Sequence, residues 1–276
     1  MARCRKTTRT HMSNEPNAKH DYWRSFWREF PTEFSEIDFF RQVGHTIDGK
    51  PYSGDQFAAM LASIVSHLEL SGEDSLLDIC CGNGLITSKL ATLCDTVVAV
   101  DFSPSLVEVA KKHHAVPNIT YHCVDALALA GARLHPNRFS RVLMYAALQH
   151  FQVEDLEPLL RGAFEHASDE FIILFGGVLD LGRKFNFLDT PEKRAMYERY
   201  CAEGKDRLGT WWDAHYVTDV CESLGLVCDI QWEEDGRPGG HYRFDAVIRR
   251  CPASGPLRQI GRIAERRISG VRRRMI

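Results

Sequence analysis

Short apolar runs alternate with amphipathic segments through the middle of the chain. The apolar runs predict strands at Leu76–Cys80, Thr96–Val100, Ile119–Cys123, Phe139–Tyr145 and Glu170–Phe175. Apolar residues at helical spacing between these runs predict helices at Leu85–Leu93, Ser105–His113 and Glu154–Ala167. Such alternation of strand and helix predicts a parallel sheet that is covered by helices on both faces.

The pattern becomes less regular after the fifth predicted strand, from Gly176 to Gly209. A helix is predicted at Asp213–Leu224, followed by strands at Val227–Trp232 and Tyr242–Arg249. A short turn rich in glycine and proline separates these two strands, so we expect them to pair as an antiparallel hairpin. The expected fold is therefore α/β, with a doubly wound, mainly parallel seven-stranded sheet that ends in this hairpin.

Two helices are predicted before the first strand. Aromatic residues recur at helical spacing within Asp21–Phe30, and we interpret this apolar face as a packing surface rather than a substrate contact. Ser53 and Gln56 form a capping-box pattern at the start of a helix that runs to about Leu68. We expect an N-terminal helical cap at residues 21–68 and a main domain at residues 69–250, with an insert at 176–212.

Charge is distributed unevenly along the chain. The net charge is −3, with +4 over residues 1–20, +6 over residues 255–276 and −13 over the remainder. A nucleic-acid-binding domain needs a positive surface, so this acidic body argues against a nucleic-acid partner.

The cysteines and the apolar runs exclude further classes of protein. The nine cysteines show no spacing typical of a metal site, so we expect reduced thiols and no metal. No apolar run approaches the roughly 20 residues that span a bilayer, and the N-terminus lacks the apolar segment of a signal peptide. We therefore expect a cytoplasmic protein.

The two ends of the chain are basic. Residues 1–20 predict a flexible N-terminal segment, and Met12 is an alternative start. Residues 251–276 predict a basic amphipathic C-terminal helix, with apolar residues on one face and arginines elsewhere. This pattern fits a helix on the anionic inner face of a membrane, or one that docks on the acidic body or on a partner protein.

A glycine-containing turn follows the first predicted strand. The strand leads through Asp78, Cys80 and Gly82-Asn83-Gly84 into a helix, where a doubly wound sheet binds a nucleotide-like ligand. Glycine lets the backbone approach such a ligand closely. A dinucleotide site requires a third glycine where Thr87 stands, which disfavours an NAD-dependent oxidoreductase.

Four segments together resemble the motifs of class I S-adenosylmethionine-dependent methyltransferases. Leu77–Gly84 resembles the first motif, with Cys80 in place of its commonest first glycine. Val97–Ser103 resembles the second motif, Val124–Ala126 the third, and Phe139–Phe151 the fourth strand with the motif after it. The resemblance covers about residues 55–250 and implies a Rossmann-like fold with S-adenosyl-L-methionine as the cofactor.

The resemblance also implies roles for individual residues. The acid at Asp101 corresponds to the one that accepts hydrogen bonds from both ribose hydroxyls, a task that suits an ionised carboxylate. The acid at Asp125 corresponds to the one that meets the adenine amino group. Cofactor contacts are implied for Asp78, Cys80, Gly82, Asn83, Gly84, Asp101, Phe102, Asp125, Ala126 and Tyr145.

His150 is the first candidate for a catalytic base, because it follows the fourth strand where the methyl group should emerge. A positioned histidine assists when the acceptor is a hydroxyl. The same position often carries a structural or cofactor-shaping histidine in the family, and both interpretations stay open. His45, His215 and His241 are weaker alternatives.

Acceptor specificity in this family usually lies in the cap and in the segment after the fifth strand. Gln42 and Thr46 either close over the cofactor or belong to an ordinary loop. The second segment contains Asp180, Asp189, Tyr197, Tyr200, Trp211 and Trp212. These residues suit a pocket for a sugar or an aromatic compound, and suit a packed lid equally well.

The function expected from these observations is transfer of a methyl group to a small-molecule, sugar or lipid-linked glycan acceptor, at oxygen ahead of nitrogen. The alternative is a non-catalytic S-adenosylmethionine-binding partner that scaffolds a membrane-associated biosynthetic complex.

Overall fold

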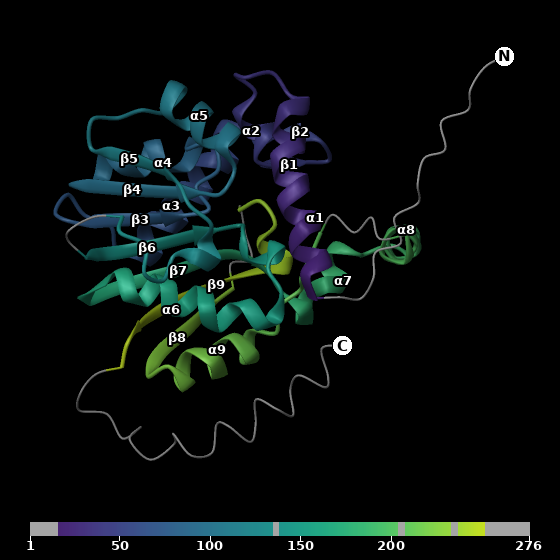
Figure 1. The fold of residues 1–276 in the computed structure, drawn as a ribbon. Helices are drawn as coiled ribbons and strands as arrows, with labels where there is room; N and C mark the ends of the chain where they lie inside the picture. The colour runs from purple at the N-terminus through teal and green to yellow at the C-terminus, as the bar shows by residue number, and fades with distance from the viewer. Residues whose placement is uncertain (1–15, 135–137, 204–207, 233–236, 252–276) are drawn as a thin grey trace.

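The computed structural model describes residues 16–134, 138–203, 208–232 and 237–251. Its main sheet has the strand order β5-β4-β3-β6-β7-β9-β8 (Figure 1). The strands are β3 (Ser75–Ile79), β4 (Thr96–Asp101), β5 (Ile119–Cys123), β6 (Phe139–Tyr145), β7 (Ala167–Leu179), β8 (Leu226–Gln231) and β9 (Arg243–Arg250). The first five in this order are parallel, whereas β9 runs antiparallel to both β7 and β8. The predicted doubly wound sheet and its C-terminal hairpin are therefore confirmed.

Helices cover both faces of this sheet (Figure 1). One face packs on α3 (Gly54–Leu68), α4 (Leu85–Leu90) and α5 (Pro104–His113), and the other on α6 (Leu156–His166) and α9 (Ala214–Ser223). Neighbouring strand residues alternate between the faces, so that Val97 packs with the α3 and α4 side and Val98 with the α6 and α9 side. Burial of both faces explains why the strands read as continuous apolar runs.

The order of strands reverses between β3 and β6. From β3 the chain proceeds outward through β4 and β5, and then returns to place β6 on the other side of β3. Helices therefore leave β3 and β6 toward opposite faces, which opens a crevice at the carboxyl ends of these two strands. The fold thus fixes where a ligand can enter.

The N-terminal part of the chain forms α1 (Pro16–Glu29), a short 3-10 turn, α2 (Phe39–Gln42) and a small hairpin of β1 (Thr46–Ile47) and β2 (Lys50–Pro51). The helix α1 begins at Pro16, five residues before the expected start. The capping box of α3 is confirmed, because the Ser53 side chain accepts from Gln56 N and Gln56 in turn accepts from Ser53 N.

The irregular stretch after β7 contains two helices that hydrophobic spacing did not predict. They are α7 (Lys184–Phe187) and α8 (Pro191–Ala202). None of the residues in α8 is buried, so its apolar residues follow no single face and leave no helical period in the sequence. The chain then returns to the core at Trp212, which is fully buried and donates from Nε1 to the carbonyl of Leu148 at 3.1 Å.

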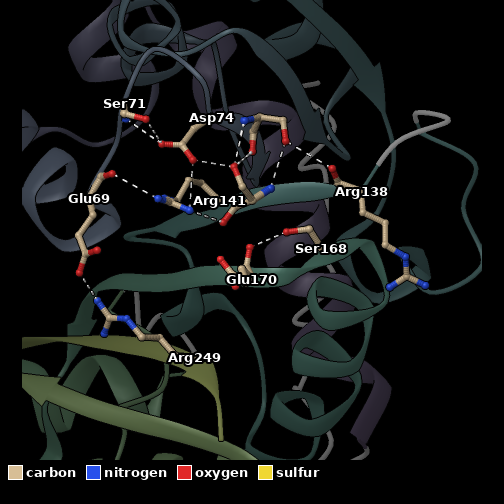
Figure 2. Close-up of polar contacts among 10 residues, drawn as sticks. Glu69, Ser71, Asp74, Arg138, Arg141, Ser168, Glu170 and Arg249 are labelled. Atoms are coloured by element: carbon tan, nitrogen blue, oxygen red, sulfur yellow. Dashed lines mark hydrogen bonds and ion pairs between the residues drawn. The ribbon is translucent and has the colours of Figure 1, made fainter. Parts of the chain in front are cut away.

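A network of charged and hydroxyl side chains ties the amino ends of β3 and β6 together (Figure 2). Asp74 accepts hydrogen bonds from Ser71 and from Ser140 Oγ at 2.8 Å, and lies 3.2 Å from Arg141. Burial raises the pKa of Asp74, but these hydrogen bonds and the Arg141 charge outweigh burial and hold it below its usual value. The network is structural, since it lies at the opposite edge of the sheet from the crevice.

Among the helices within the described ranges, none combines the length and the apolar character required to cross a bilayer.

Candidate functional site

A pocket lies at the carboxyl ends of β3, β4, β5 and β6 and is lined in part by residues of α1. We call it the first pocket. Figure 1 shows α1 beside this edge of the sheet. Of the residues proposed from the sequence for the cofactor or for catalysis, those that line the first pocket are His45, Asp78, Cys80, Gly82, Asn83, Asp101, Phe102, Asp125, Ala126, Tyr145 and His150. Segments that are widely separated in the sequence therefore meet at one site.

Asp101 is held in place by the backbone on both of its carboxylate oxygens. Oδ2 accepts from the N–H of Gly82 and Oδ1 from the N–H of Ser103, each at 2.9 Å. Burial raises the pKa of Asp101 to about 6; the two backbone donors work against this rise, and the charge of Asp125 adds to it. The carboxylate is thus fixed in direction while each oxygen keeps a free lone pair for a ligand.

Asp78 is the most strongly perturbed carboxyl group of the first pocket. Thr87 donates a 2.6 Å hydrogen bond to its Oδ2, and both side chains are buried. Burial, together with the nearby charge of Asp101, raises the pKa of Asp78 to about 7 in spite of this bond. The structure thereby explains why threonine stands at position 87, where a dinucleotide fold would have glycine.

Two polar residues of α1, which sequence reasoning had not singled out, reach the first pocket. Arg24 donates to Asp125 Oδ2 at 2.6 Å, and His20 lies 2.6 Å from Asp155. Asp125 also accepts from the N–H of Leu127 at 3.0 Å. The signal was present in the sequence as the helical spacing of His20, Arg24 and Trp27, which places them on one side of α1.

The glycines of the turn after β3 are also required by packing within the chain. A Cβ on Gly82 would lie 2.9 Å from Cγ1 of Val43 in the cap, and Gly82 has a φ of +57°. A Cβ on Gly84 would lie 2.6 Å from the hydroxyl oxygen of Tyr121, and Gly84 is absent from the lining of the first pocket. The absence of a Cβ at these positions therefore serves backbone conformation and packing within the chain.

Cys80 occupies the left-handed region with a φ of +60°. For a residue with a Cβ this conformation costs roughly 1–2 kcal/mol of conformational free energy, whereas glycine adopts it freely. The substitution of cysteine for the commonest glycine of the motif thus leaves backbone strain at the edge of the pocket.

The cap loop contributes to the pocket through residues other than those expected. Asn83 donates from Nδ2 to Gln42 Oε1 at 2.9 Å and to the carbonyl of Phe39 at 2.8 Å. Gln42 and Thr46 do not line the pocket, whereas Val43 and His45 do. Gln42 therefore fastens the cap to the turn after β3, and its neighbours form the wall.

A second pocket adjoins the first. The two pockets share Trp23, Trp27, Val43, His45, Tyr145, Ala146 and His150 as a common wall. The rest of the second pocket comes from Phe26, Phe30, Gly44, Tyr52, Gln149, Gly177, Leu179, Phe187, Leu208, Trp211, Pro238, Tyr242 and Arg243. Four of the aromatic residues of Asp21–Phe30 line this pocket, so their contact with an acceptor stays open beside their packing role.

His150 lies in the shared wall, between the two pockets. Its ring centroid is 4.3 Å from that of Trp23 and 5.1 Å from that of Trp27, and its Nδ1 has no hydrogen-bond partner within the described part of the chain. Burial, together with the charge of Arg243, lowers the pKa of His150 to about 3. The imidazole is thus neutral and has a nitrogen lone pair for an incoming group.

The other three histidine candidates differ in whether they line a pocket. His45 lines both pockets; burial, followed by the charge of Arg243, lowers its pKa to about 4. His215 and His241 are exposed, and neither lines a pocket.

Of the candidates in the insert, Trp211 alone lines the second pocket. Trp212 belongs to the core, while Asp180 accepts hydrogen bonds from Gly182 N and Trp232 Nε1. Asp189 forms an ion pair with Lys193, and Tyr200 is exposed. The hydroxyl of Tyr197 accepts a hydrogen bond from Lys184 Nζ at 3.2 Å. The insert thus acts partly as pocket wall, through Phe187, Leu208 and Trp211, and partly as a packed layer.

Residues 76–169 match a family model described as a methyltransferase domain. The malonyl-[acyl-carrier protein] O-methyltransferase of Bacillus cereus is 32% identical over 127 residues, 45% of this chain and 44% of that protein. The ubiquinone biosynthesis O-methyltransferase of Brucella anthropi is 40% identical over 83 residues, 29% of this chain and 32% of that protein. The chain thus spans about half the length, or less, of these curated relatives.

The fold also resembles solved structures over most of its length. An S-adenosylmethionine-dependent methyltransferase from Anabaena variabilis has a TM-score of 0.58 and 19% identity, covering 89% of this chain and 100% of that one. A magnesium protoporphyrin IX methyltransferase from Synechocystis with bound S-adenosylhomocysteine has a TM-score of 0.55 and 14% identity, covering 84% and 100%.

Proposed function

We propose that this chain, a member of the class I S-adenosylmethionine-dependent methyltransferases, transfers a methyl group to an oxygen atom of a small-molecule, sugar or lipid-linked glycan acceptor. One observation carries the proposal. The carboxylates of the three acidic motifs line one pocket, and His150 stands in the wall between that pocket and a second one.

The first pocket suits S-adenosyl-L-methionine by the chemistry of its donors. Asp78, Asp101 and Asp125 line it, and among the described residues only Asp125 of these three is paired with a cation, Arg24. Burial, and to a smaller extent repulsion among the carboxylates, raises the pKa of Asp78 and Asp101, and a cationic ligand would relieve this repulsion. Asp101 has lone pairs left for the ribose hydroxyls, and Asp125 lies beside the N–H of Ala126 for the adenine end.

The cofactor, when bound, supplies an electrophilic methyl group on a sulfonium sulfur. What this chain must add is alignment of an acceptor oxygen, which alone lowers the barrier substantially. The shared wall of the two pockets provides that meeting point. The rings of Trp23 and Trp27 also pack against His150 in this wall.

His150 has the position and the protonation state of a base for an acceptor hydroxyl. Because the imidazole is neutral, it can accept the hydroxyl proton without first losing one. Burial and Arg243 both oppose the imidazolium form. An acceptor that neutralises Arg243 would remove the second of these effects and raise the basicity of His150.

Oxygen as the methylated atom is favoured by the relatives, since both curated proteins named above are O-methyltransferases. Their own acceptors, a carrier-bound malonyl group and a ubiquinone precursor, differ from each other. The chemistry of the second pocket, and not the acceptors of these relatives, therefore indicates the acceptor of this chain.

The proposal is tested by calorimetry with S-adenosylmethionine and by turnover of methyl-labelled cofactor against a panel of hydroxylated acceptors. We expect binding by the wild-type chain and label transfer to an acceptor oxygen. Failure to bind the cofactor would overturn the proposal. Tight binding without transfer to any acceptor would favour the scaffolding alternative.

Residues 252–276 lie outside the described residues, so the membrane-binding role of the basic tail stays a prediction from the sequence. A membrane helix would gain about 1 kcal/mol for each basic residue near an anionic surface. Removal of residues 256–276 should then abolish binding to anionic vesicles at low salt and leave cofactor affinity unchanged. If the full chain does not bind such vesicles, we favour a tail that docks on the rest of the protein or on a partner protein.

A further inference from the structure

The second pocket combines aromatic walls with a single charged group among its described lining residues. Aromatic side chains come from α1, the cap hairpin, β6, the insert and the turn before β9, and include Trp27, Tyr52, Tyr145, Phe187, Trp211 and Tyr242. His45 and His150 are neutral, for the reasons given above. The remaining charge is the guanidinium of Arg243, at the start of β9.

Arg243 is half-buried and carries a charge that no carboxylate of the described residues neutralises. It donates from one Nη to the carbonyl of Gly177, and its guanidinium carbon lies 5.3 Å from the ring centroid of Tyr242. No acidic oxygen lies within 4 Å of it in the described ranges. By contrast, the nearby Arg237 is buried against the carboxylate of Asp245.

The charge of Arg243 is felt at the transfer site. It lowers the pKa of both His45 and His150, the two histidines of the shared wall. A guanidinium has five N–H donors in one plane, and the Gly177 carbonyl occupies one of them. Its free edge is suited to a bidentate pair with a carboxylate.

The two pockets also have opposite charge. Three carboxylates line the first pocket, which suits a cationic ligand, whereas the described lining of the second has no carboxylate and one guanidinium. Phe187 and Tyr242 lie with their ring centroids 4.8 Å apart, and Trp211 and Tyr242 with theirs 6.3 Å apart, so that flat apolar surfaces adjoin Arg243. Such walls favour a planar ring that stacks or meets them edge to face.

We propose that the methyl acceptor is a hydroxylated aromatic acid, whose ring lies between the aromatic walls of the second pocket and whose carboxylate pairs with Arg243. This inference rests on the proposed function of the same site. The carboxylate acts as the anchor, which leaves a ring hydroxyl to face His150 and the shared wall.

The test is calorimetry with matched pairs of probes, in which the acid and its amide differ only in charge: 4-hydroxybenzoate and 4-hydroxybenzamide, and 4-hydroxycinnamate and its amide. S-adenosylhomocysteine is present at saturation. We expect the acid to bind about 10- to 150-fold more tightly than the amide, the range for hydrogen bonds to a charged group. Arg243→Gln should abolish this preference, and Arg243→Lys should keep part of it, since lysine retains charge without the planar fork.

Arg249→Gln is the matched control, because Arg249 lies on the same strand, pairs with Glu69 and is remote from both pockets. It should leave the preference for the acid intact. The melting temperature and the affinity for S-adenosylhomocysteine, measured for each variant, show that the fold and the first pocket survive. Should Arg243→Gln fail to fold, the comparison between the wild type and Arg243→Lys still tests the pairing.

Equal affinity for acid and amide would overturn the inference, as would failure of both members of both pairs to bind. So would a preference for the acid that persists in a folded Arg243→Gln variant. In each case, retained affinity for S-adenosylhomocysteine would leave the proposed methyltransferase function standing. Loss of cofactor binding in the wild type would instead count against that function itself.

Discussion

The backbone N–H of Gly82 donates a 2.9 Å hydrogen bond to Oδ2 of Asp101, and so joins the turn after β3 to the end of β4. Ser103 N holds the other oxygen at the same distance. The carboxylate is therefore oriented before any ligand arrives, which reduces the ordering cost of binding.

Asp101→Asn should weaken S-adenosylmethionine binding by roughly 10- to 150-fold. The amide has one oxygen instead of two, and its NH2 group faces a backbone donor, so a hydrogen bond to a charged group worth about 1.5–3 kcal/mol is lost. Calorimetry on the folded variant measures the change. Asp95→Asn, at the other end of β4 and exposed, is the control and should bind normally. Unchanged affinity in Asp101→Asn would remove Asp101 from the site.

Cofactor affinity should rise with pH between about 5.5 and 8. Burial raises the pKa of Asp101 to about 6 and that of Asp78 to about 7, whereas a cationic ligand with hydroxyl donors prefers both groups ionised. Below these pKa values, binding must expel protons, so affinity at pH 5.5 should be about tenfold or more below that at pH 8. Calorimetry at pH 6.5 in two buffers of different ionisation enthalpy should detect proton release. Binding that is independent of pH and of buffer would contradict the assignment.

His150→Ala should lower turnover by roughly 10²- to 10⁴-fold with cofactor affinity nearly unchanged, the range for general acid–base catalysis. The exposed His215→Ala serves as the control. Single-turnover kinetics at saturating substrates separate the chemical step from binding. A structural role of His150 predicts the reverse, with weaker binding or a lower melting temperature and a modest change in chemistry.

Cys80→Gly should raise the free energy of unfolding by about 1 kcal/mol, because glycine relieves the strain of a φ of +60°. Gly82→Ala should have the opposite effect, since its φ is +57° and the new Cβ would press on Val43. Urea denaturation of both variants compares them directly. A destabilised Cys80→Gly variant would mean that packing of the thiol outweighs the backbone strain.

Local patterns in the sequence were sufficient to predict the strands, most of the helices and the acidic positions of the site. Asp78 lies within β3, Asp101 ends β4 and Asp125 follows β5 closely. The carboxyl ends of parallel strands meet at one edge of a sheet, so their order along the chain was enough to bring these residues together. The packing role of Gly82 and Gly84 could not be predicted, because the neighbours of a Cβ, Val43 and Tyr121, come from distant segments.

The sequence by itself determined the α/β sheet, the crevice at its carboxyl edge and the acids that line it, because each follows from a local period or from the position of a residue at a strand end. Only the tertiary structure decided that Arg24 reaches Asp125, 101 positions away, and that Arg243 faces the same pocket as His150. The physical reason is that these contacts depend on how α1 and the antiparallel β9 pack on the sheet. Packing between distant elements is governed by the shape and charge of both surfaces together, which no local pattern records.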